Sequence, residues 1–79
     1  MFTLRILIVE DDSVSALLLQ RALEKNNHQI IGIADTGEKA LEILDEYGAD
    51  IVMMDINLAG ELDGIKTTEI INEKFDIPV

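Results

Sequence analysis

Two short runs of consecutive apolar residues in this chain end directly in acidic residues. Residues 6–9 (Ile-Leu-Ile-Val) precede three acids at positions 10–12, and residues 51–54 (Ile-Val-Met-Met) precede Asp55. A continuous apolar run of this length predicts a strand that is buried on both faces, as in parallel sheets. If the two strands are parallel neighbours, their carboxyl ends lie side by side, and so do the acids that follow them.

Helical and extended patterns alternate along the whole chain. Apolar residues at helical spacing follow the first strand, and Asp12 or Ser13 is suited to cap that helix. Its core-facing stripe is predicted to be Val14, Leu17, Leu18 and Ala22, widened by Leu19 and Leu23. The predicted strands are Leu4–Val9, Gln29–Ala34 and Ile51–Met54, and the predicted helices are Ser13–Asn26, a segment that ends at Tyr47, and Gly64–Phe75.

The second helix has signals at both of its ends. Asp35 followed three residues later by Glu38 has the spacing of a capping box, and Gly48 is placed to end the helix. Strands that alternate with helices predict right-handed crossovers and a parallel sheet, so the fold class is α/β.

The end of the chain resembles the entry to a fourth strand. Residues 76–79 (Asp-Ile-Pro-Val) place Pro and β-branched residues where a strand would begin. Without that strand, the outer edge of Ile51–Met54 is unpaired and apolar, which favours association. We therefore expect residues 1–79 to be the front part of a larger domain, and we expect a homodimer or strand exchange through this edge if the chain stands alone.

The acids at the two strand ends predict a cation site. Carboxylates held close together repel one another unless a cation neutralises them. An all-oxygen cluster of this kind suits Mg²⁺. Glu10, Asp11, Asp12 and Asp55 would supply three or four carboxylates for a magnesium site, although Glu10 to Asp12 taken alone are more simply explained as a polar strand end and a helix cap.

The composition narrows the class of protein. Apolar residues make up 48% of the chain and charged residues 28%, which indicates a folded globular domain. The net charge of −10 argues against direct binding to nucleic acid. There is no cysteine and no apolar run long enough to span a membrane, so a cytoplasmic location is expected.

Taken together, these motifs resemble the receiver domain of two-component response regulators. The resemblance is carried by residues 6–12, 36–41, 50–58 and 63–65, in order and at the right spacing. It implies a flavodoxin-like (CheY-like) parallel sheet with helices on both faces. This chain would supply three strand-helix units, with strands four and five lying beyond it. The switch hydroxyl and the lysine that such domains carry at the ends of those strands would also lie beyond Val79.

The resemblance also implies a role for each matched residue. Asp55 would be the phosphoacceptor, Asp11 a direct Mg²⁺ ligand, and Glu10 an acid that reaches the metal through water. Asn57 would contribute its backbone carbonyl to the same ion, and Asp12 would begin the first helix. The loop departs from the common pattern at Ala59, where a Pro is usual.

The implied function is that of a phosphoacceptor domain. A sensor histidine kinase or a phosphotransfer protein would donate a phosphoryl group to Asp55 with Mg²⁺, and the phosphorylated state would switch a downstream interaction. Such a domain phosphorylates itself and has at most autophosphatase activity. The alternative is a truncated or degenerate receiver that acts as a protein-interaction module without phosphorylation.

Other interpretations of the same residues are weaker. The segment from Asp55 resembles an EF-hand loop, but Lys66 stands where that loop requires a bidentate Glu. A dehalogenase-type phosphohydrolase would need an acid two residues after its nucleophile, and Asn57 cannot protonate a leaving group. We expect His28 to be solvated, and Met53 and Met54 to be core residues.

Overall fold

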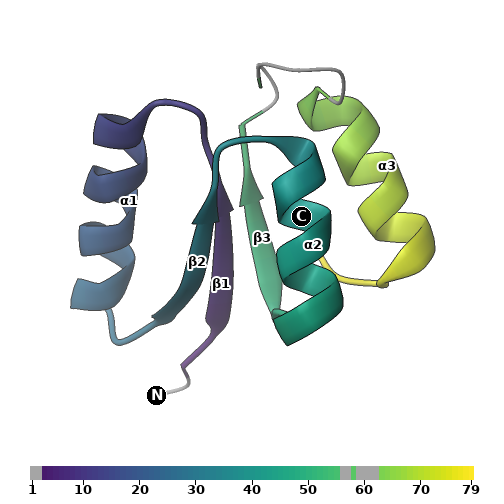
Figure 1. Ribbon diagram of the computed structural model, residues 1–79. Helices are drawn as coiled ribbons and strands as arrows, with labels where there is room; N and C mark the ends of the chain where they lie inside the picture. The colour runs from purple at the N-terminus through teal and green to yellow at the C-terminus, as the bar shows by residue number, and fades with distance from the viewer. Residues whose placement is uncertain (1–2, 56–57, 59–62) are drawn as a thin grey trace.

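The computed structural model describes residues 3–55, 58 and 63–79. Within these residues the strands and helices alternate in the predicted order (Figure 1). The elements are β1 (Arg5–Val9), α1 (Ser13–Lys25), β2 (Gln29–Ala34), α2 (Gly37–Tyr47), β3 (Ile51–Met54) and α3 (Gly64–Lys74). They differ from the predicted elements only at their ends, where helices fray and caps decide the last residue.

The strand β1 lies at the centre of a parallel sheet with the order β2-β1-β3. It pairs in register with β3, from Ile6 opposite Ile51 to Val9 opposite Met54. Residues 6–9 are almost completely buried, as the continuous apolar run predicts. Because the strands are parallel, the residues that follow β1 and β3 emerge at the same edge of the sheet.

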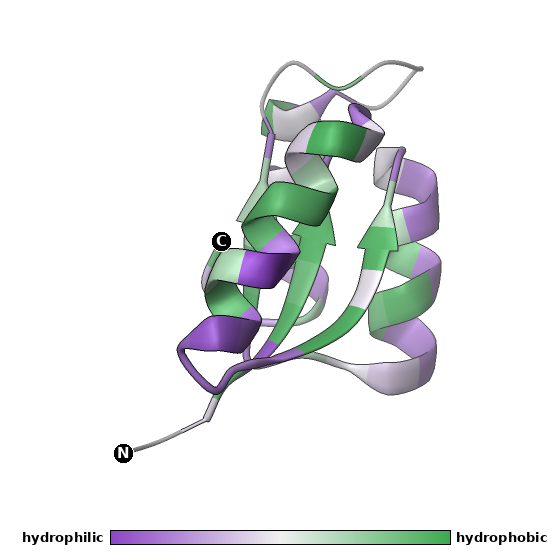
Figure 2. Cartoon of the chain, turned by 90° about the vertical axis from the view of Figure 1, so that its left-hand side faces the viewer, coloured by the Kyte–Doolittle hydropathy of each residue, from purple (hydrophilic) through white to green (hydrophobic). Residues whose placement is uncertain are grey.

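Helices cover both faces of the sheet, and β1 divides its side chains between them. Leu7 and Val9 pack in the core cluster that includes residues of α2 and α3, while Ile6 and Ile8 pack with Ala16 of α1. Figure 1 shows α1 on one side of the sheet and α2 with α3 on the other. In Figure 2 the strands are mostly coloured as hydrophobic, whereas the helices carry both colours.

The predicted core stripe of α1 is wrong in part. Val14, Leu17 and Leu18 are 63%, 44% and 61% exposed, respectively. The residue of α1 that is buried is Ala16, and Leu19 and Leu23 pack beside it against the sheet. Those three positions share one face at spacings of three and four residues. Since apolar residues surround much of α1, the pattern alone did not decide which face meets the sheet.

The N-terminus of α2 is capped by Thr36, one residue later than the spacing predicts. The Thr36 Oγ1 accepts a hydrogen bond of 3.1 Å from the Lys39 N–H, so Glu38 lies within the first turn and Asp35 precedes the cap. At the other end Gly48 terminates α2, as predicted. Its φ of 69° and ψ of 176° are accessible almost solely to glycine.

Two local features were not evident in the sequence. The pairing of β1 with β2 shifts register between Ile6, opposite Ile30, and Leu7, opposite Gly32, so Ile31 is an additional residue in β2. His28 is half-buried, and its Nδ1 accepts a hydrogen bond of 3.1 Å from the Leu4 N–H. The expectation of a solvated His28 is therefore corrected: it links the residues before β1 to those before β2.

The last residues of the chain lie beside β3. The Val52 N–H donates to the Pro78 carbonyl oxygen at 3.0 Å, and Ile77 packs against the core cluster shared with α2 and α3. Part of the β3 edge is thus covered by the chain itself, and association through this edge stays a prediction. Among the described residues no helix has the length and apolar character needed to cross a bilayer.

We expect Gly48→Ala to lower the free energy of unfolding by about 1–3 kcal/mol, because alanine is strained at the backbone angles of Gly48. Gly32→Ala is the matched control. A Cβ at Gly32 would meet Ile43 Cδ1 at 3.5 Å, an ordinary contact, so this change should be neutral or stabilising by about 0.5 kcal/mol. Urea unfolding of both variants measures the difference, and equal losses would contradict this account of α2 termination.

Candidate functional site

The acids that follow β1 and β3 are held in place by main-chain hydrogen bonds. The Glu10 N–H donates to the Ala34 carbonyl oxygen and the Asp55 N–H donates to the Val9 carbonyl oxygen, each at 2.9 Å. The ladder between neighbouring strands therefore continues one residue beyond each strand. This pairing fixes the backbone of Glu10 and Asp55 at one edge of the sheet, regardless of their charge.

Three carboxylates meet at this edge. Glu10, Asp11 and Asp55 each offer one oxygen, and these oxygens all lie within 4.8 Å of one another. Glu10 and Asp55 are half-buried, whereas Asp11 is exposed. The structure therefore brings together the three described residues that the sequence predicted for a metal site. The fourth, Asn57, lies outside the described residues.

The surroundings of Glu10 shift the pKa of its carboxyl group in opposite directions. The hydrogen bond from the Asp12 N–H is the largest single influence on the pKa of Glu10, and it lowers that pKa. Partial desolvation and the neighbouring carboxyl groups of Asp55 and Asp11 together outweigh it, so the pKa of Glu10 lies above its ordinary value of 4.5. The ionised form of Glu10 is therefore disfavoured at this place, and a cation bound nearby would favour it.

Asp12 is the N-cap of α1, as predicted, and its carboxylate accepts hydrogen bonds from the first turn of that helix. Its Oδ1 accepts from the Val14 N–H at 3.2 Å and its Oδ2 from the Ser15 hydroxyl at 2.7 Å. The bond from Ser15, followed by that from Val14, holds the pKa of Asp12 below its ordinary value of 3.8. Asp12 is thereby a helix cap that remains ionised beside the acidic cluster.

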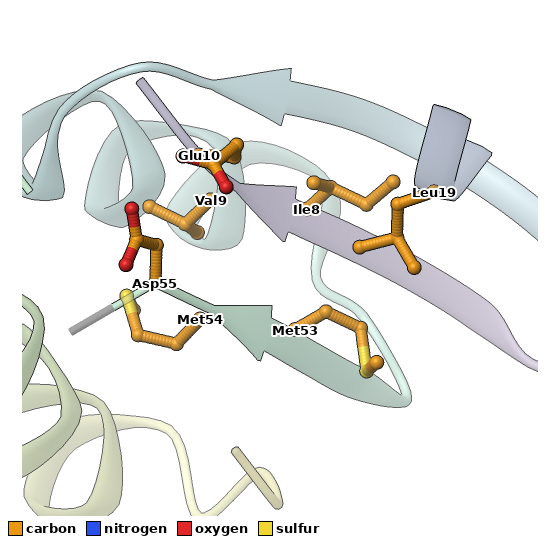
Figure 3. A pocket seen from close by; sticks show the side chains of 7 residues that line it. All are labelled: Ile8, Val9, Glu10, Leu19, Met53, Met54 and Asp55. Atoms are coloured by element: carbon orange, nitrogen blue, oxygen red, sulfur yellow. The ribbon is translucent and has the colours of Figure 1, made fainter. Parts of the chain in front are cut away.

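An apolar groove of about 210 Å³ leads from the acids along the α1 side of the sheet (Figure 3). It is lined by Ile8, Val9, Glu10, Leu19, Met53, Met54 and Asp55. Met53 and Met54 pack against the two core clusters on opposite faces of the sheet, in line with the prediction that they are core residues, but both are only half-buried and also contribute to the lining of this groove. No pattern in the sequence distinguishes a groove-lining methionine from a core one, since both continue the same apolar run.

The arrangement suits a hard divalent cation and a carboxylate nucleophile. Carboxylate oxygens are preferred ligands of Mg²⁺, which binds through one or two of them and keeps several waters. Asp55 lies at the carboxyl end of its strand, where open α/β sheets bind ligands. Fold and site together define a parallel α/β domain with an acidic cluster at the carboxyl edge of its sheet.

Comparison with known proteins identifies that class. Residues 6–79 match the response regulator receiver domain family, so the chain belongs to this family, which serves two-component signalling. The predicted resemblance and the flavodoxin-like receiver fold are thereby confirmed.

Individual relatives agree with the family. The chain is 38% identical over 77 residues to a protein-glutamate methylesterase/protein-glutamine glutaminase of Methanospirillum hungatei, which covers 96% of this chain and 22% of that protein. It is 35% identical over 69 residues to the chemotaxis protein CheY of Bacillus subtilis, covering 87% of this chain and 57% of CheY. The crystal structure of the response regulator PhyR from Brucella abortus superposes with a TM-score of 0.92 at 31% identity, covering 99% of this chain and 32% of PhyR.

We expect the pH dependence of stability to change in Glu10→Gln. A carboxyl whose pKa is raised in the folded state contributes stability below its unfolded pKa, and this contribution is lost as pH rises through the folded value. The wild-type protein should therefore lose unfolding free energy relative to Glu10→Gln as pH rises above about 4.5.

Urea unfolding at intervals between about pH 4 and pH 7 measures this difference. Glu42→Gln, on the exposed surface of α2, controls for the loss of one negative charge. Wild-type and Glu10→Gln curves that run parallel over the whole range would show that the cluster does not raise the pKa of Glu10.

Proposed function

We propose that this chain accepts a phosphoryl group on Asp55 and that the phosphorylated state switches a downstream interaction. The observation that carries the proposal is the placement of Asp55 at the end of β3, half-buried and within one cluster with Glu10 and Asp11. The family assignment supports it, because response regulators are signalling proteins. The proposed role is that of a phosphoacceptor, which has at most autophosphatase activity of its own.

Phosphoryl transfer requires from the protein mainly that it position the reacting groups and neutralise the charge of the phosphoryl oxygens. A carboxylate oxygen of Asp55 forms a bond to phosphorus while the bond from phosphorus to the donor nitrogen breaks, and that nitrogen leaves with the electron pair. When the donor is a phosphohistidine protonated on its other ring nitrogen, the leaving group is a neutral imidazole. Because the Asp55 N–H is hydrogen-bonded to the Val9 carbonyl oxygen, the backbone of Asp55 is already oriented before a donor arrives.

We propose that Mg²⁺ is held by Asp11 and Asp55 directly, by Glu10 through water, and by the backbone carbonyl of Asn57. The three described acids fit the ion, since they supply oxygen ligands within one cluster and the pKa of Glu10 is raised by its neighbours. When bound, the ion would supply positive charge that neutralises the phosphoryl oxygens. Asp11 is the exposed member of the cluster, so its carboxylate is accessible to an ion from solvent.

The proposed partner is a sensor histidine kinase or a phosphotransfer protein. The exposed apolar side chains of α1, at Val14, Leu17 and Leu18, lie on the helix that begins directly after the acids. A partner that packs against the first turn of this helix would lie beside the acids that precede it. The net charge of −10 disfavours direct contact with nucleic acid, and a cytoplasmic location is in keeping with the absence of cysteine.

This chain spans only part of the length of its longer relatives. The methylesterase relative is matched over 22% of its length. What the chain shares with it and with CheY is the receiver domain, so phosphoacceptance is the function the shared part supports.

Incubation with acetyl phosphate and Mg²⁺ should give one phosphoryl adduct, detected by intact-mass spectrometry and labile to base. The adduct should be absent from Asp55→Asn, because the amide is not a nucleophile toward phosphorus. Glu42→Ala is the control, since Glu42 is exposed on α2 away from the cluster, and it should react like the wild type. An adduct that persists in Asp55→Asn would overturn the assignment. No adduct in a folded wild-type chain would favour the interaction module.

Addition of Mg²⁺ should raise the melting temperature of the wild-type chain more than that of Asp11→Asn. A ligand at about 100 times its Kd stabilises the folded state by about 2.7 kcal/mol when it binds only that state. Without Mg²⁺, Asp11→Asn should be at least as stable as the wild type, because one charge is removed from the cluster. Asp45→Asn, an exposed acid of α2, is the control, and an equal Mg²⁺ effect in Asp11→Asn would exclude Asp11 as a ligand.

A further inference from the structure

We propose that Ser15 is a positioning residue for the acidic site. Its hydroxyl group restrains Asp12, the N-cap residue of α1, and the N–H of Asp12 in turn holds the carboxylate of Glu10 in place. The inference deepens the proposed function and rests on it, because a Glu10 carboxylate held in one place would contribute to binding a cation at Asp11 and Asp55. Ser15 itself touches neither the cluster nor a donor, so its role is exerted through Asp12 and Glu10.

The observations form a chain of hydrogen bonds from α1 to the cluster. Ser15 donates its hydroxyl to Asp12 Oδ2 at 2.7 Å, and the Val14 N–H donates to Asp12 Oδ1 at 3.2 Å. The Asp12 carbonyl oxygen accepts from the Ala16 N–H at 3.0 Å, so the cap is held through both its side chain and its main chain. The Asp12 N–H then donates to Glu10 Oε2 at 3.2 Å.

This cap differs from a capping box in one respect. In a capping box, a Glu or Gln three residues after the cap accepts a hydrogen bond from the N–H of the cap residue. Here Ser15 holds that third position, and it donates to the Asp12 side chain instead. The Asp12 N–H is therefore available to Glu10, which takes the place that a Glu or Gln at position 15 would have.

The hydrogen bond from the Asp12 N–H restrains one member of the cluster. Glu10, Asp11 and Asp55 offer oxygens that lie within 4.8 Å of one another, and the bond to Glu10 Oε2 fixes the place of the Glu10 carboxylate among them. Hydrogen bonds of this kind to groups around a metal change metal affinity by about 10- to 100-fold when they are removed. Ser15 acts one bond further away, so we expect about three- to tenfold for its loss.

Two substitutions distinguish a role of Ser15 in positioning Glu10 from a role in capping α1. Ser15→Ala removes the hydroxyl that locks Asp12. Ser15→Gln completes a neutral capping box, which should keep or raise the stability of α1 while it takes the Asp12 N–H away from Glu10. Ser13→Ala is the matched control, because Ser13 is an exposed serine of the same helix turn and makes no hydrogen bond to Asp12 among the described residues.

The experiment titrates Mn²⁺, which takes the same oxygen ligands as Mg²⁺, into the four folded chains by calorimetry. Urea unfolding without metal and the NMR signal of the Asp12 amide accompany it. We expect Ser15→Ala and Ser15→Gln to bind Mn²⁺ about three- to tenfold more weakly, with Ser13→Ala within about twofold of the wild type. The unfolding free energy of Ser15→Gln should not fall, and its Asp12 amide signal should shift.

Three results would overturn the inference, and they are distinguishable. If the wild type binds Mn²⁺ and both Ser15 variants bind within about twofold of it, the positioning role is wrong and the proposed site stands. If the wild type itself binds no Mn²⁺, the proposed metal site fails and the inference fails with it. A loss of affinity in Ser13→Ala as large as in Ser15→Ala would likewise assign the effect to helix stability and not to Glu10.

Discussion

The parallel pairing of β1 with β3 brings three carboxylates close together at one edge of the sheet, where like charges repel one another. The strands pair residue for residue up to Val9 and Met54, so the next residue of each strand, Glu10 and Asp55, emerges at the same level. Main-chain hydrogen bonds then hold both residues there. Because those bonds involve no side chain, they hold the backbone of both acids in place whatever the charge of the carboxyl groups. At this edge, partial desolvation and the neighbouring Asp55 and Asp11 carboxyl groups outweigh the hydrogen bond from the Asp12 N–H and raise the pKa of Glu10.

The buried centre of the sheet makes this arrangement tolerable. Ile6 to Val9 pack on both faces of β1, and each face has its own helix cover. Burial of apolar surface stabilises by about 25 cal/mol per Å², so a well-packed central strand withstands a local electrostatic cost at its end. The apolar centre of the sheet therefore offsets the electrostatic cost of gathering acids at its end.

The α1 side of the sheet contributes to the site in two ways. The first turn of α1 presents the Asp12 N–H to Glu10 and ties the loop after β1 to the helix. Further along, Leu19 lines a groove with Met53 that opens toward the acids. The same helix exposes Val14 and Leu18 to solvent. The hydrogen bond to Glu10 and the shared groove are the physical reason to expect that changes on α1 affect a site to which α1 contributes no carboxylate.

The sequence by itself determined the order of the elements, the parallel sheet, and the acids Glu10, Asp11 and Asp55, because each follows from periodicity over a few neighbouring residues. It did not determine the buried face of α1, since apolar residues lie around much of that helix and only the sheet selects Ala16. The additional residue at Ile31 and the bond from Leu4 to His28 depend on how β1 lies against β2 and its preceding loop. Tertiary structure decided these features because the atoms involved come from segments that are distant along the chain and meet only when the sheet forms.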